Sequence, residues 1–167
     1  MFDAVYQHPR RALSIVGASC VGLLVFGVLY LQQSVGLEPC PMCIVQRYLL
    51  ILVALVAGVA AMLPERRARN VGVGVMGLLA SCGAFVAARQ SFLQWNPPEI
   101  MSCGRDFYGM IETFPLKRAI PMIFKGSGDC STVDWTFLGL TIANWSFLCF
   151  SGIAAFAVLF LMGRRHS

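Results

Sequence analysis

Cys40 and Cys43, separated by two residues, are the pair in this sequence most clearly suited to chemistry. A CxxC pair can alternate between dithiol and disulfide, or it can supply half of a metal site. An apolar stretch begins directly after the pair, at Ile44. We therefore expect Cys43 to lie at the N-terminus of a helix, whose partial positive charge favours a thiolate.

Arg47 follows Cys43 by four residues, so both side chains share one face of the expected helix. A charged side chain inside an apolar, membrane-spanning segment is costly and commonly has a functional role. The alternative is an arginine that extends to the membrane surface and only anchors the helix. We interpret Arg47 as a candidate site residue beside the cysteine pair.

Two more cysteines, Cys103 and Cys130, lie in a long stretch between apolar segments. With Cys40 and Cys43 they could form a four-cysteine zinc site, but their wide spacing differs from the second CxxC of most zinc sites. Loops in an oxidising compartment favour disulfides over metal thiolates. We therefore favour a redox role with no metal, and keep structural disulfides or a zinc site as alternatives. The remaining cysteines, Cys20, Cys82 and Cys149, lie within apolar segments and are interpreted as small buried side chains.

The composition is that of a membrane protein, because 57% of the 167 residues are hydrophobic and 13% are charged. We expect one integral membrane domain over residues 1–167. Four segments are apolar and long enough to span a bilayer: residues 12–31, 44–63, 71–88 and 140–162. The stretches 32–43 and 89–139 are expected to be loops. This order predicts an all-α protein whose four transmembrane helices form an up-down bundle.

The long loop, residues 89–139, is too short to build a core of its own. Residues 89–95 are expected to form a short helix that ends before Pro97 and Pro98. Residues 115–125 mix apolar and basic side chains, which predicts a segment lying flat on the membrane surface. The bundle should therefore carry a long extracytoplasmic loop with short interfacial helices.

The positive charge follows the ends of the apolar segments. The formal net charge is +5, but the basic residues do not form one patch, which excludes a nucleic-acid-binding protein. Seven arginines lie in the two tails and in the short turn after the second span: Arg10, Arg11, Arg66, Arg67, Arg69, Arg164 and Arg165. The positive-inside rule places both termini in the cytoplasm and both cysteine-containing loops on the opposite side.

The arrangement resembles the DsbB family of disulfide bond formation proteins from bacterial inner membranes. The resemblance is carried by residues 38–44 and 46–48, by Cys103, and by residues 127–130 and 135–140. The order of spans and loops also matches, so the resemblance covers almost the whole chain.

This resemblance implies an enzyme that reoxidises a periplasmic DsbA-type thiol oxidase and passes the electrons to ubiquinone or menaquinone. It implies that Cys103 forms a transient mixed disulfide with the partner and that Cys130 is its partner in the loop disulfide. Electrons then reach the pair through a Cys40–Cys130 bridge. Cys43, as a thiolate, donates to a quinone held near Arg47.

The second residue expected to contact the quinone is either Gln90 or Arg89. Some family members have a histidine near the end of the third helix, beside the quinone, and Gln90 stands at the corresponding place next to Arg89. Either side chain could donate to a quinone oxygen. Relatives of vitamin K epoxide reductase are also four-helix thiol–quinone enzymes, but there the CxxC lies late in the chain. A four-helix structural or transport protein with a zinc clip is the alternative from another class.

Overall fold

The structure is a computed structural model that describes residues 8–36, 40–96, 133 and 135–163. Helix α2 (Pro9–Val25) continues into a π-helix, η1 (Phe26–Ser34), and is followed by α3 (Pro41–Met62), α4 (Arg66–Trp95) and α8 (Ile142–Gly163). Two-residue strands β1 (Thr136–Phe137) and β2 (Leu140–Thr141) pair antiparallel just before α8. Within these residues, four helices are long and apolar enough to cross a membrane, as the sequence predicts.

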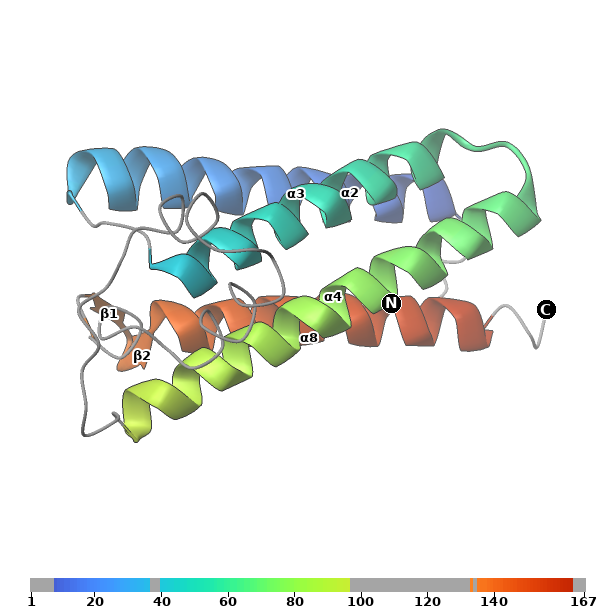
Figure 1. Cartoon of the computed structure of the whole chain (residues 1–167). Coiled ribbons are helices and arrows are strands. Elements are labelled where there is room, and N and C mark those ends of the chain that lie inside the picture. The colour runs from blue at the N-terminus through green and yellow to red at the C-terminus, as the bar shows by residue number, and fades with distance from the viewer. Residues whose placement is uncertain (1–7, 37–39, 97–132, 134, 164–167) are drawn as a thin grey trace, which may run out of the picture.

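The helices run alternately in opposite directions, so the short turn between α3 and α4 lies at one end of the bundle and the start of α3 at the other (Figure 1). Helix α2 packs on α3, α3 on α4, and α4 on α8. By contrast, α2 and η1 make only sparse contact with α8. The bundle is therefore an open series of three helix pairs, and its first and last members leave space between them.

The helix bounds differ from those expected. The predicted third span, residues 71–88, extends over Arg66–Trp95, and the predicted separate helix at residues 89–95 is the last part of α4. No proline or glycine occurs where the two predicted segments meet, so the helix continues and ends before Pro97. The fourth span begins at Ile142, because Leu140 and Thr141 belong to β2. The predicted surface segment, residues 115–125, lies outside the described residues.

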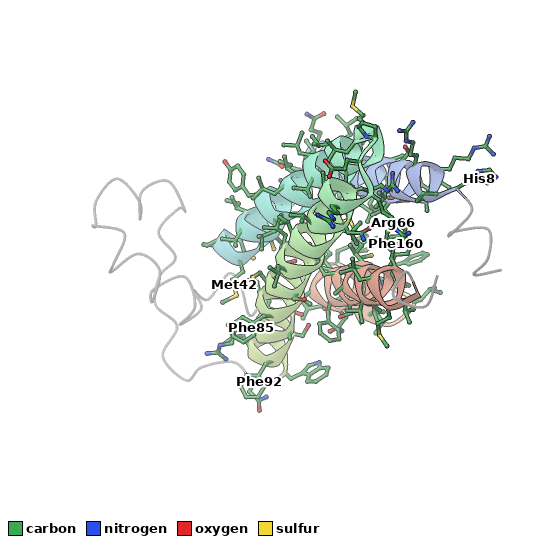
Figure 2. All side chains as sticks on the ribbon, turned by 90° about the vertical axis from the view of Figure 1, so that its right-hand side faces the viewer. His8, Met42, Arg66, Phe85, Phe92 and Phe160 are labelled. Atoms are coloured by element: carbon green, nitrogen blue, oxygen red, sulfur yellow. The ribbon has the colours of Figure 1, made fainter. Side chains whose placement is uncertain are left out.

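Small residues on α4 allow close helix packing. A Cβ atom at Gly83 would lie 2.5 Å from ring carbons of Phe150 on α8, and one at Gly77 would lie 2.9 Å from the Cβ of Ala157. Figure 2 shows Phe85 and Phe92 projecting from the outer side of α4, where both are exposed, whereas Phe160 is buried in the core. The apolar outer surface suits a lipid environment.

Candidate functional site

The cysteine pair forms the first turn of α3. Cys40 is the N-cap residue, Pro41 follows at the first helical position, and the backbone N–H of Cys43 donates to Sγ of Cys40 at 3.3 Å. The helix therefore begins three residues earlier than Ile44, because proline suits its first position and the Cys40 sulfur caps it. The Sγ atoms of Cys40 and Cys43 lie 2.6 Å apart, so both sulfurs lie at the positive end of the helix.

Gln90 lies against the two sulfur atoms, and Gln46 is hydrogen-bonded to Gln90. Nε2 of Gln90, on α4, is 3.4 Å from Sγ of Cys40 and 3.3 Å from Sγ of Cys43. Oε1 of Gln90 accepts a 2.7 Å hydrogen bond from Nε2 of Gln46, on α3. Both glutamines are buried. The pair therefore presents an N–H donor to both sulfurs, an arrangement that favours sulfur in its anionic form.

Arg47 lies one turn after Cys43 and reaches toward η1. Its Nη1 donates to Oε1 of Gln32 at 2.7 Å, and its Nη2 is 3.3 Å from the backbone oxygen of Gly27. The side chain is half-buried, and neither partner is charged. These two partners therefore do not neutralise the guanidinium, which lies one helical turn from Cys43. The π-helical conformation of η1, which supplies both partners, occurs frequently at functional sites.

A cavity of about 630 Å³ lies between η1, α3 and α8, with Cys40, Cys43, Arg47 and Gln90 in its wall. Most of the remaining lining is apolar or aromatic and includes Tyr30, Leu50, Trp145 and Phe150. The cavity occupies the space that the sparse contact between η1 and α8 leaves open. Its size lies within the usual range for small-molecule sites, which are mostly apolar with a few fixed polar groups.

Aromatic residues join η1, the β-hairpin and α8 beside this cavity. The rings of Phe26 and Trp135 meet edge to face at 6.4 Å, and Trp135 stacks on Phe137 at 6.0 Å. Nε1 of Trp145 donates to the backbone oxygen of Phe137 at 3.1 Å. The hairpin turns at Leu138 and Gly139, both with positive φ, as in tight two-residue turns. Trp135 and Phe137, from the stretch 135–140 that carries part of the resemblance, thus form part of the cavity wall.

The structure brings together four of the six predicted site residues: Cys40, Cys43, Arg47 and Gln90. Cys103 and Cys130 lie outside the described residues. Of the two candidates near the end of the third helix, Gln90 faces the sulfurs. The guanidinium of Arg89 instead lies 5.6 Å from the ring centre of Phe92.

Sequence reasoning missed Gln46 and misjudged two cysteines. Gln46 is a polar residue inside an apolar span, three positions after Cys43, and that signal could have identified it. Burial is confirmed for Cys20, but Cys82 is exposed on the outer surface of α4. Cys149 is half-buried and lines the cavity. A periodic apolar segment does not reveal which of its faces meets lipid and which meets a cavity.

The sequence is similar to those of known proteins. Residues 9–160 match the family described as disulfide bond formation protein DsbB. The chain is 71% identical to a disulfide bond formation protein B of Polaromonas sp. (strain JS666 / ATCC BAA-500), over 92% of this chain and 89% of that protein. It is 64% identical to the protein of the same name from Polaromonas naphthalenivorans (strain CJ2), over 99% of this chain and 100% of that protein. The chain, a multi-pass membrane protein with a CxxC pair at the end of its bundle, therefore belongs to the DsbB family of disulfide bond formation proteins.

Proposed function

We propose that this protein is a thiol:quinone oxidoreductase of the bacterial inner membrane, which reoxidises a periplasmic DsbA-type oxidase and passes the electrons to ubiquinone or menaquinone. One observation carries the proposal. The sulfurs of Cys40 and Cys43 lie in the wall of a largely apolar cavity within the membrane-spanning bundle, beside Arg47 and Gln90. The thiol pair thus borders directly on a cavity that can hold an apolar molecule.

The residues of the cavity fit a quinone. Its aromatic and aliphatic walls suit a flat apolar ring, and its volume of about 630 Å³ leaves room for part of an attached chain. Arg47 and Gln90 are donors suited to ring oxygens. When bound, a quinone accepts two electrons and two protons. Because η1 and α8 make only sparse contact, a lipid-soluble molecule has a route into the cavity between them.

Residues around the cysteine pair stabilise a thiolate when the disulfide opens. In the proposed exchange, the partner's thiolate attacks Cys103 of a Cys103–Cys130 disulfide and releases Cys130. Cys130 then attacks Cys40 of the Cys40–Cys43 disulfide, a new Cys40–Cys130 bond forms, and Cys43 leaves as a thiolate. The N–H group of Gln90 faces Cys43, and the charge of Arg47 lies one turn away. Both hold the leaving sulfur in its anionic, electron-donating form.

The proposed orientation places both termini in the cytoplasm and the cysteine loops in the periplasm. The start of α2 lies at the same end of the bundle as the turn between α3 and α4, opposite the cysteine pair (Figure 1). The arginines at positions 10, 11, 66, 67 and 69 belong to this end. Such a concentration of arginine is typical of the cytoplasmic side.

Quinone reduction by the purified protein in detergent tests the proposal. A reduced thioredoxin-fold oxidase should drive reduction of a short-chain ubiquinone analogue, measured by the change in quinone absorbance. Replacing Cys103 by Ser should abolish this reaction and leave reduction driven by a small dithiol intact. Bound zinc in stoichiometric amount, with no quinone reduction from either donor, would instead establish the alternative of a structural zinc site held by Cys40, Cys43, Cys103 and Cys130.

A further inference from the structure

Arg69 is a buried arginine that pairs with no carboxylate within the described residues. It lies in the first part of α4, at the end of the bundle opposite the cysteine pair, and is 8% exposed. Its Nη1 is 3.4 Å from the backbone oxygen of Leu63, and its Nε has no hydrogen-bond partner within the described part of the chain. A buried, unpaired charge is strongly unfavourable. An anion bound beside this guanidinium would therefore stabilise the protein.

A second cavity, of about 320 Å³, lies beside this side chain. It is lined by His8, Pro9, Arg10, Arg11 and Arg69. None of these described wall residues is acidic, whereas three carry guanidinium groups. Basic side chains gathered in this way create a positive potential that favours an anion beside the buried guanidinium.

The N-terminus of α2 adds to the positive potential of this cavity. His8 is the N-cap residue but makes no side-chain cap, and the first turn of α2 contains no acidic residue. The first backbone N–H groups of a helix carry a partial positive charge and bind phosphate well. Arginine adds donors in a planar fork that matches two phosphate oxygens. The site therefore combines a helix end, two exposed arginines and one buried arginine.

We propose that this cavity binds the phosphate group of an anionic phospholipid. The position favours a lipid over a soluble anion, because the arginines flank the apolar, membrane-spanning parts of α2 and α4. A headgroup phosphate lies at this depth while its acyl chains cover the apolar helix surfaces. The lipid would fix α2 to the start of α4, two helices joined through α3. This site is independent of the proposed redox function.

Thermal unfolding of the full chain in detergent tests the site, with phosphatidylglycerol added in one arm and phosphatidylcholine in another. We expect phosphatidylglycerol to raise the unfolding temperature by on the order of 4 °C more than phosphatidylcholine does. The increment should be lost in Arg69→Gln. It should be retained in Arg67→Gln, which removes an exposed arginine outside the cavity. The double variant Arg10→Gln, Arg11→Gln alters only exposed side chains, and it should also lose the increment.

Three outcomes overturn the proposal. The first is an equal lipid increment in the wild type and in Arg69→Gln. The second is an equal rise with inorganic phosphate at matched ionic strength, which would identify a soluble anion as the ligand. In the third, phosphatidylglycerol does not raise the unfolding temperature of the wild type, and Asp3→Asn lowers that temperature as much as Arg69→Gln does. This result would identify a carboxylate of the chain itself as the anion.

Discussion

Gln46 on α3 donates a 2.7 Å hydrogen bond to Oε1 of Gln90 on α4, and this bond fixes which end of the Gln90 amide faces the cysteine pair. An amide presents a donor at one end and an acceptor at the other, so reversing it would turn an oxygen toward the sulfurs. Both side chains are buried, so few other groups of the protein can replace either partner. Gln46 therefore acts on the sulfurs through Gln90.

Replacing Gln46 by Met should slow alkylation of reduced Cys40 and Cys43 roughly tenfold at neutral pH, because the reactive form is the thiolate and Gln90 loses its fixed orientation. The measurement uses the full chain with Cys103 and Cys130 replaced by Ser, iodoacetamide as the reagent, and mass spectrometry of the peptides. Gln94→Met is the matched control, because Gln94 also lies on α4 but its Oε1 accepts a hydrogen bond from Thr141 and not from Gln46 or Gln90. Its rates should stay near those of the parent chain.

A double substitution separates orientation from general damage. Replacing Gln46 and Gln90 together by Met leaves no unpaired amide at these two interior positions, so this variant should fold. Its alkylation rates should equal those of Gln90→Met alone, because Gln46 has nothing left to orient. Additive effects of the two substitutions would show that Gln46 does not act through Gln90.

Replacing Arg47 by Gln should raise the KM for quinone at least roughly tenfold, because a charge-assisted hydrogen bond is lost, and Arg47→Lys should retain part of the activity. Exchange of Cys103 with the partner should be unchanged. Steady-state kinetics over a range of quinone concentrations measure both. Gln32→Leu is the control for a tethering role, since it removes a partner of Arg47 on η1 and keeps the charge. If it raises the KM as much as Arg47→Gln does, Arg47 serves to hold η1 in place.

Replacing Gly83 by Ala should lower the unfolding temperature by roughly 2–12 °C. The new Cβ would lie 2.5 Å from the Phe150 ring, and overpacking of this kind commonly costs about 1–3 kcal/mol. Gly74→Ala is the control, since a Cβ there meets nothing within 4 Å. Adding Phe150→Leu to Gly83→Ala should restore part of the loss. Equal unfolding temperatures for both glycine variants would show that α4 and α8 can separate without cost.

The orientation of the chain can be checked by labelling. A membrane-impermeant thiol reagent applied from the periplasmic side should modify reduced Cys103 and Cys130 and should not reach a cysteine added at the C-terminus. The reverse pattern would place the arginine-rich end of the bundle in the periplasm. Cys82 is expected to be silent, because it lies within the lipid-exposed part of α4.

The sequence predicts the spans and part of the site for identifiable reasons. Uninterrupted apolar segments locate the four helices, and the i, i+4 spacing places Arg47 on the helix face of Cys43. Gln46 and Gln90 are 44 positions apart, and their hydrogen bond depends on how α3 and α4 align along their lengths. No local pattern encodes that alignment. The π-helical conformation of η1 could not be predicted from the sequence either, because Phe26–Ser34 has the composition of an ordinary helix.

The sparse contact between the first and last helices has a mechanical consequence in a bilayer. A closed bundle resists compression through its own packed interior, but an unsealed side transmits the lateral pressure of the acyl chains to whatever lies within. Widening that side breaks few direct contacts between η1 and α8, but it strains the aromatic contacts that the β-hairpin makes with both. The width of the cavity is therefore set by these contacts acting against the lateral pressure of the acyl chains. Bilayer thickness and acyl-chain order thereby influence the width of the cavity beside Cys43.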